Sequence, residues 1–317
     1  MAVDIDRDAL QTFALNFPDV PALRADVAQT AFDHLHADVV VAGPPCQGFS
    51  TLNRRRAGDP RNLLLFDVVR CAEEVEARAV VVENVPPMLK ATEGHQLVAS
   101  LRQRGYRVRA GVLNAAYFGV PQTRLRALVI GIRDGAAAWP EQLNDDDPRS
   151  PLPAVRTVAD AFALLSREPD GHNWHRSYER LTATSRARYR AVPEGGSRSD
   201  IPLDLRFDCW RDARGHSDVL GRLHWRRPAS TLRTEFFRPE KGRFLHPTED
   251  RPITVREAAR LQSFPDTFRF PEGQTLTSVA RQVGNAMPPR LAASIARALQ
   301  RALAGQARQR SAADAVG

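Results

Sequence analysis

The chain has 317 residues, 43% of them hydrophobic, and a formal net charge of +8. This length predicts about two domains with substantial cores, and no apolar run is long enough to span a bilayer. The first residues lack the basic-then-apolar pattern of a secretory signal, and the three cysteines show no Cys-x-x-Cys spacing. We therefore expect a cytoplasmic protein without a disulfide framework, a metal site or a membrane association.

The first predicted element is the end of a β-strand at residues 2–6, followed by an amphipathic helix over about 8–17. Asp4 stands at the end of this strand. An acidic residue in that place is where a dinucleotide-type fold holds ribose hydroxyls. Asp6 and Asp8 have a simpler interpretation, because acidic residues at the start of a helix cap its exposed backbone amides.

Residues 39–50 read Val-Val-Val-Ala-Gly-Pro-Pro-Cys-Gln-Gly-Phe-Ser. Three valines bounded by glycine and proline predict a short strand that is buried on both faces and ends abruptly in a loop. In open α/β sheets the functional residues lie just beyond the carboxyl ends of the strands, and Cys46 lies there. A lone cysteine is more often a small buried hydrophobe, but the two prolines and Gly48 favour a functional loop.

A second strand is predicted to end in an acidic residue. A polar loop over 54–62 and a helix over 63–75 precede the apolar run 79–82, which ends in Glu83. A helix near 94–104 and a strand over 106–113 follow.

The segment 127–132 reads as the third strand, and alternation places Arg124 and Arg126 on one face if that segment is extended. A thiol, a carboxylate and two guanidinium groups near the ends of three strands predict an active site.

The next region is basic and irregular. Residues 145–153 are rich in proline and aspartate and indicate a linker or domain edge. Between His172 and His246 there are sixteen Arg and Lys against nine Asp and Glu. A basic surplus in one region is expected of a phosphate-binding surface, and we expect Arg222, Arg226 and Arg233 to face phosphate there. The chain has 43 Arg and only two Lys, a bias that explains the choice of arginine but not its concentration here.

The last predicted elements are two helices. Thr254 and Glu257 have the spacing of a capping box at the start of a helix over 254–265, which favours a structural role. A helix from Pro289 to about Leu303 then returns the chain to the first domain.

Four short motifs carry a family resemblance. They are Pro45-Cys46-Gln47, Glu83-Asn84-Val85, Gln122-x-Arg124-x-Arg126 and Gln282-Val283-Gly284-Asn285-Ala286. In this order, with an arginine-rich insert between the third and the fourth, they resemble the DNA (cytosine-5) methyltransferases over about residues 1–300. Residues 226–234 resemble the family's next motif, which organises its target-recognition region.

The resemblance implies an α/β fold: a Rossmann-like S-adenosylmethionine-dependent methyltransferase sheet with a smaller, irregular target-recognition domain. Residues 1–145 would form the catalytic and cofactor domain and 146–250 the target-recognition domain. In the C-terminal segment 251–317, the helix after residue 288 would return to the catalytic domain.

The implied reaction is methyl transfer from S-adenosylmethionine to C5 of a cytosine that is flipped out of a specific double-stranded DNA sequence. Cys46 would add to the ring at C6, and protonated Glu83 would donate toward N3. Arg126 would hold the ring O2, while Arg124 would lower the pKa of the thiol and orient Glu83.

The resemblance also assigns binding residues and partners. The cofactor-binding residues would be Asp4, Ile5, Asp26, Val27, Pro45, Leu64 and Asn285. The DNA-binding residues would be Gln47, Ser50, Arg61, Arg226, Arg227 and Arg233. The protein would act as a monomer without a metal, beside a cognate restriction endonuclease as a functional partner.

One feature departs from the family pattern. A Phe-x-Gly-x-Gly loop should lie about 20 residues before the ribose-binding acid, but Asp4 has only three residues before it. We expect the first strand, its glycine turn and the first helix to be absent, through a start codon assigned too late or a genuine truncation. Loss of that central strand would leave neighbouring edges unpaired, and the chain as written would bind S-adenosylmethionine poorly.

Two alternatives follow. One is a truncated, catalytically inactive relative that still binds DNA. The other is an unrelated α/β enzyme with a cysteine nucleophile, such as a hydrolase. That enzyme would need a histidine base, and no histidine lies at a predicted strand end near Cys46 in the sequence.

Overall fold

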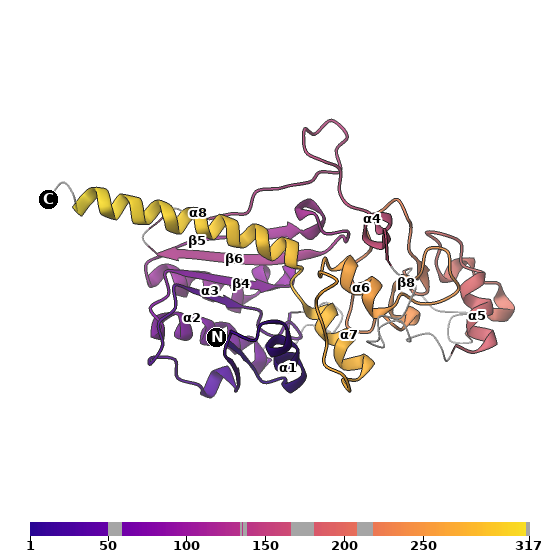
Figure 1. The fold of residues 1–317 in the computed structure, drawn as a ribbon, viewed down its shortest axis with the longest axis horizontal. Coiled ribbons are helices and arrows are strands. Elements are labelled where there is room, and N and C mark those ends of the chain that lie inside the picture. Colours follow the sequence, from indigo (N-terminus) through magenta and orange to yellow (C-terminus); the bar gives the residue numbers. More distant parts are fainter. Residues whose placement is uncertain (50–58, 134, 136–137, 166–180, 208–217, 315–317) are drawn as a thin grey trace.

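The computed structural model describes residues 1–49, 59–133, 135, 138–165, 181–207 and 218–314, with the backbone alone for 305–314. Within this part of the chain, no helix is both long and apolar enough to cross a membrane. Figure 1 shows a sheet flanked by helices in one half of the molecule and shorter, less regular elements in the other.

The main sheet has four strands in the order β3-β4-β6-β5. Strand β4 is parallel to β3, and β6 is antiparallel to both β4 and β5. A separate parallel pair consists of β1 and β2. The bounds are β1 Ala2–Asp4, β2 Ala22–Arg24, β3 Val39–Ala42, β4 Ala79–Asn84, β5 Tyr106–Asn114 and β6 Leu125–Arg133.

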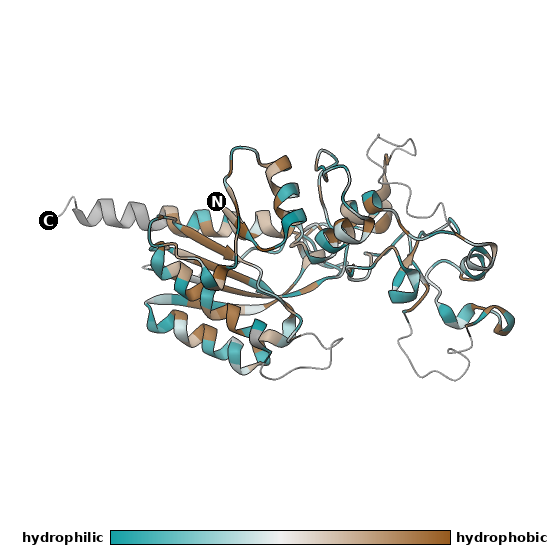
Figure 2. Cartoon of the chain, turned by 90° about the horizontal axis from the view of Figure 1, so that it is seen from below, coloured by the Kyte–Doolittle hydropathy of each residue, from teal (hydrophilic) through white to brown (hydrophobic). Residues whose placement is uncertain are grey.

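Helices cover both faces of the main sheet, and side-chain alternation explains why. Val80 and Val82 of β4 point to the layer formed by α2 (Leu64–Glu74) and α3 (Thr92–Gln103). Val81, on the opposite face, packs with side chains of α8 (Pro289–Asp314). Successive residues of a strand face opposite sides, so a continuous apolar run is what two covered faces require. Figure 2 shows hydrophobic stretches in the strands of this sheet.

The structure confirms the predicted strand at β4, in which every residue is buried, and the predicted third strand at β6. The prediction that residues 39–41 are buried on both faces is wrong. Strand β3 pairs with β4 on one side only, and the side chain of Val41 is 65% exposed. Among the described residues β3 is an edge strand. Val41 is exposed because no neighbouring strand among these residues covers this side of β3.

The N-terminal helix α1 spans Arg7–Asn16. Asp6 is its N-cap and accepts hydrogen bonds from the amides of Asp8 and Ala9, as predicted. Asp8 instead lies in the first turn, and its carboxylate accepts from the hydroxyl of Ser278 in α7 (Leu276–Asn285). Polar contacts therefore join the start of the chain to α7, which is more than 260 residues away along the chain.

The second half has its own apolar core, which extends from Val158 to Val283 and includes α4, α6 and α7. The predicted capping box of α6 is confirmed, with Thr254 and Glu257 exchanging hydrogen bonds of 3.1 Å and 2.7 Å. The helices and strands here are α4 Val158–Phe162, α5 Ala183–Arg190, α6 Val255–Leu261, β7 Gly221–Arg222 and β8 Arg243–Leu245. Short 3-10 helices in both halves are η1 Val27–Gln29, η3 Pro60–Leu63, η4 Pro86–Lys90, η5 Ala115–Phe118, η6 Arg198–Asp200, η7 Leu203–Leu205 and η9 Pro239–Lys241.

Candidate active site

The ends of β3 and β4 and the start of β6 bring a thiol, a carboxylate and a guanidinium group to one edge of the sheet. Ala42, the last residue of β3, pairs with Val82 of β4. The loop that carries Cys46 therefore begins beside Glu83, which is the next residue of β4. The amide of Asn84 fixes this arrangement, because its Nδ2 donates to the carbonyl of Pro44 over 3.1 Å. The sequence motif that contains Asn84 thus joins two strand ends.

Glu83 and Arg126 form an ion pair in this edge. Glu83 lies opposite Leu128 of β6, and Arg126, two residues from Leu128, shares its face of the sheet. The two side chains meet with 2.7 Å between Arg126 Nε and Glu83 Oε1. The contact is an ion pair of imperfect alignment, since Oε1 accepts no hydrogen bond of good geometry from the described residues.

Burial perturbs both members of the pair. Desolvation raises the pKa of Glu83, and the charges of Arg126 and Arg124 only partly oppose this. Desolvation also lowers the pKa of Arg126, against the charges of Glu83 and Cys46. A carboxyl whose pKa is raised by burial can carry a proton that it then donates. Glu83 is thus suited to act as a general acid.

Arg124 lies close enough to Glu83 and Cys46 for their charges to interact, but its hydrogen bonds go to backbone carbonyls. Its side chain is fully buried, and burial lowers its pKa to about 9. Its guanidinium donates to the carbonyls of Leu232, Gly284 and Ala286, at 3.1, 2.8 and 3.1 Å. In the described chain Glu83 forms its ion pair with Arg126. Arg124 connects the start of β6 to the segment around Leu232 and to the end of α7.

Two glutamines extend this contact. Gln122 Nε2 donates to Gln262 Oε1 and to the carbonyl of Leu261, and Gln122 Oε1 accepts from the amide of Leu232. Gln262 in turn donates to the carbonyl of Val283. Gln122 and Gln262 are both fully buried. We call Gln122, Arg124 and Gln262 the buried polar cluster.

Arg61 lies close enough to Cys46 for their charges to interact. Its guanidinium makes two hydrogen bonds to Asp59, of 2.9 and 2.6 Å. These bonds are the main cause of the raised pKa of Arg61, to which the charge of Cys46 also contributes. Arg61 is exposed while Asp59 is buried, so the guanidinium of this ion pair faces solvent.

The expected cofactor residues lie around the ends of β1, β2, β3 and α7. Asp4 and Ile5 are exposed just after β1, and Asp4 accepts a hydrogen bond from the amide of Asp6. Asp26 caps η1 by accepting from the amide of Ala28. Val27, Pro45 and Leu64 are half-buried, and Asn285 is exposed at the end of α7.

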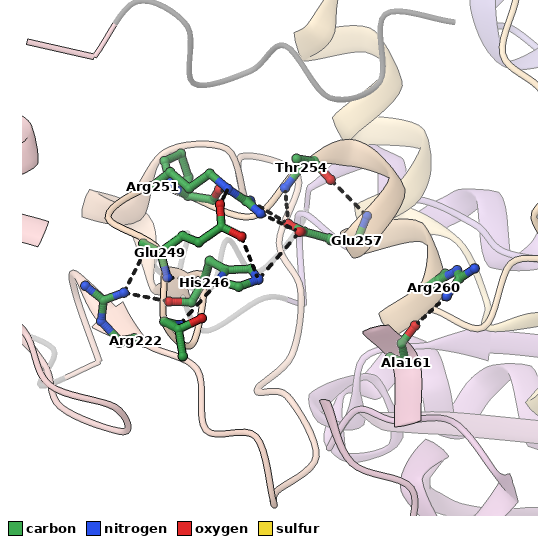
Figure 3. A network of polar contacts seen from close by, with 10 residues as sticks. Ala161, Arg222, His246, Glu249, Arg251, Thr254, Glu257 and Arg260 are labelled. Carbon is green, nitrogen blue, oxygen red and sulfur yellow. Dashed lines mark hydrogen bonds and ion pairs between the residues drawn. The ribbon is translucent and has the colours of Figure 1, made fainter. Parts of the chain in front are cut away.

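The structure changes the expectation for Arg222. This residue is 3% exposed, and its guanidinium donates to the carbonyls of His246 and Glu249 (Figure 3). A buried guanidinium that already satisfies protein carbonyls cannot face DNA phosphate. The prediction for Arg222 is therefore wrong, because a count of charges along the sequence does not separate surface arginines from buried ones.

The other expected DNA-binding residues differ in exposure. Arg226, Arg227 and Gln47 are exposed, whereas Arg233 is partly exposed and donates to the carbonyl of Lys241. Arg227 also lines a surface cavity of about 470 Å³ that includes Thr123 and Thr231. Ser50 lies outside the described residues.

Three residues near the site were missed by the sequence reasoning. They are Asp59, which binds Arg61, Asn62, which contacts Gly48 of the Cys46 loop, and Gln262, which binds Gln122. An available signal was Asp59-Pro60, since an acidic N-cap before proline marks a helix start. Among the residues that the structure describes, no group of three His, Cys, Asp or Glu side chains is placed to hold a metal ion.

The fold defines the class first. A crystal structure of a prophage-encoded E. coli protein assigned to the DNA modification methyltransferases superposes with a TM-score of 0.70. The match covers 96% of this chain and 92% of that one at 24% identity, and it shows a shared mixed α/β methyltransferase fold.

Sequence comparison then identifies the family. The model of the C-5 cytosine-specific DNA methylases matches residues 1–301. Type II methyltransferase M1.HphI of Haemophilus parahaemolyticus is 34% identical over 94% of this chain and 80% of that protein. Type II methylase M.HgiDII of Herpetosiphon aurantiacus is 32% identical over 84% and 77%. The chain belongs to the C-5 cytosine-specific DNA methylase family, whose enzyme class is DNA (cytosine-5-)-methyltransferase.

Proposed function

We propose that this enzyme methylates C5 of a flipped-out cytosine in a specific double-stranded DNA sequence through a covalent bond to Cys46. The observation that carries the proposal is the edge of the sheet where the Cys46 loop, the buried carboxyl of Glu83 and Arg126 converge. A thiol, an acid with a raised pKa and a cation are what this substitution requires.

The thiolate of Cys46 forms a bond to C6, and the electron pair of the C5–C6 double bond is delocalised toward N3 as Glu83 donates its proton there. C5 is then nucleophilic and would take the methyl group from a sulfonium, whose sulfur keeps the bonding electron pair and leaves as a thioether. Loss of the C5 proton to a base restores the C5–C6 double bond and expels the Cys46 thiolate, and the N3 proton returns to Glu83. Arg126 would bind the ring O2, which draws electron density in the same direction.

S-adenosylmethionine would supply the methyl group as a sulfonium. The residues present fit its adenosine part: the carboxylate of Asp4 is exposed at a strand end, and the adjacent Ile5 is a 66% exposed apolar side chain. We propose that Asp4 accepts from ribose hydroxyls and Ile5 packs on adenine. Asp26, Val27, Pro45, Leu64 and Asn285 would complete this surface.

The substrate side is proposed to be residues 146–250, in front of the sheet edge. Arg226 and Arg227 are exposed cations there, and Arg61 and Arg233 are further candidates. Phosphate contacts of this kind position a duplex without reading its sequence. Both reported relatives are named as type II enzymes, so we propose a restriction–modification role for a monomer in the cytoplasm.

The substitution Cys46→Ser tests the proposal. A hydroxyl is a much weaker nucleophile than a thiolate, so methyl incorporation into DNA should be abolished while binding in a gel shift is retained. Cys71→Ser is the matched control, because Cys71 is a half-buried residue of α2 that burial makes less acidic by raising its pKa. Turnover by the Cys46 variant would remove the covalent mechanism, and inactivity of the unmodified chain with retained binding would favour a DNA-binding relative.

A further inference from the structure

Asn62 makes an unusual contact with the turn that carries Cys46. The turn is closed by a hydrogen bond of 3.0 Å from the amide of Phe49 to the carbonyl of Cys46, and Gly48 lies inside it. A Cβ atom added to Gly48 would lie 2.0 Å from Asn62 Oδ1 and 2.8 Å from its Cγ. The amide of Asn62 thus fills the space in which any other residue at position 48 would place its side chain.

Asn62 is held in this position from behind. Its Nδ2 donates to Oε1 of Glu93, in the first turn of α3, over 2.9 Å. A carboxylate can only accept, so the nitrogen of the amide must face Glu93 and the oxygen must face Gly48. Because the side chain is 3% exposed, it has little room to swing aside.

The oxygen that faces Gly48 has no hydrogen-bond donor among the described residues. A buried acceptor without a donor destabilises a fold. The hydrogen bond to Glu93 accounts for the nitrogen of the Asn62 amide, but it gives no partner to the oxygen that faces Gly48. Its oxygen instead abuts the Cα of Gly48, where a weak C–H···O contact is the interaction available.

We propose that Asn62 is a positioning residue for the nucleophile: it braces Gly48 and thereby fixes the Cys46 turn against α3. This rests on the proposed role of Cys46 as the nucleophile. Attack on C6 requires the sulfur to lie within about 3–3.5 Å of the carbon in the correct direction, and a displacement of about 1 Å can cost 100-fold in rate. A rigid glycine turn with a fixed neighbour meets this need better than a free loop.

The test is a cycle of Gly48→Ala, Asn62→Ala and the double variant. Gly48→Ala should lower kcat about 100-fold, because its Cβ must move the turn by about an ångström. Asn62→Ala should lower kcat about tenfold with an almost unchanged KM for DNA, because the turn is loosened but not displaced. In the double variant the new methyl group occupies the space left by the amide, so kcat should rise back to the level of Asn62→Ala.

Two further measurements separate positioning from folding. The rate of Cys46 alkylation by iodoacetamide should change in the single variants while that of Cys71 stays constant. Asn144→Ala is the matched control, since it removes another buried asparagine, which binds the carbonyl of Ala154, and should leave kcat and Cys46 alkylation unchanged.

Additive effects in the cycle, or wild-type kcat in Asn62→Ala, would overturn the inference. If Gly48→Ala fails to fold, the kcat and alkylation of Asn62→Ala decide alone. The failures are distinguishable: an active Cys46→Ser variant refutes the proposed function, whereas an inactive one together with an additive cycle refutes only the role of Asn62.

Discussion

Arg222 is expected to stabilise the second half of the molecule from inside rather than to bind DNA. Its guanidinium donates five hydrogen bonds, to four backbone carbonyls and one carboxylate. The acceptors are the carbonyls of Tyr189, Val192, His246 and Glu249 and the carboxylate of Asp250, at 2.5 to 3.2 Å. Removing a buried charged partner typically costs about 3–5 kcal/mol, and each buried acceptor left without a donor about 1–3 kcal/mol. We expect Arg222→Ala to lower the free energy of unfolding by about 3–5 kcal/mol.

Urea unfolding followed by tryptophan fluorescence measures this loss, because Trp225 packs edge-on against His246 with 5.5 Å between ring centroids. Arg227→Ala is the matched control from the same basic segment, since its side chain is exposed. A surface change of this kind should stay within about 0.5 kcal/mol of the parent. Arg227→Ala should instead make the fall of log affinity with log salt concentration less steep, by about 0.9 in slope, which is the value for one lost phosphate contact.

The opposite pattern would refute the reasoning. If Arg222→Ala unfolds at the parent urea concentration and lowers the salt slope, the guanidinium faces phosphate and its buried position is incorrect. If Arg227→Ala leaves the salt slope unchanged, the exposed cations beside the cavity do not contact DNA.

Two predictions concern the titration of buried groups. Since burial raises the pKa of Glu83, its proton is lost at a higher pH than that of an ordinary carboxyl, and kcat should fall as the pH rises through this value. Glu83→Gln should be about 10² to 10⁴-fold slower and lack this dependence, and an equally steep alkaline decline in the variant would exclude Glu83 as the acid. His246 has its pKa lowered to about 4, chiefly by burial, against about 6.5 for an unfolded histidine. As the pH falls, His246 therefore takes up a proton in the unfolded chain before it does so in the folded protein. The free energy of unfolding should fall by a few kcal/mol between pH 6.5 and pH 4. Urea midpoints at pH 7.5 and 5 should differ less for His246→Asn than for the parent, and equal differences would contradict the assignment.

The parts of the fold that the sequence predicted correctly depend on neighbours along the chain. The run at β4 is apolar at every position because both faces are covered, and the capping box of α6 lies within four residues. The exposure of Val41 could not be predicted in this way. It depends on whether a further strand lies beside β3, and the residues of β3 themselves do not show this.

The same limit applies to arginines. Arg126, Arg124 and Arg222 have identical chemistry, and the sequence separates them only by motif and local charge. Their roles are set by acceptors far away in the chain: Arg124 binds the carbonyl of Gly284, 160 residues later, and Arg222 binds that of Glu249. Local periodicity cannot reveal such contacts, because backbone carbonyls carry no sequence signal.

The buried polar cluster connects the two halves of the enzyme. Arg124 is one residue before β6, and Leu232, which it binds, belongs to the segment next to the exposed cations of the second half. A pKa of about 9 keeps its guanidinium charged at neutral pH. A charged donor bound to three buried carbonyls strongly resists displacement, because moving it would leave a charge and its acceptors unpaired. The segment around Leu232 and the strand that carries Arg126 are therefore held in one fixed relation, so a duplex bound as proposed on the first would be held at a fixed distance from the second.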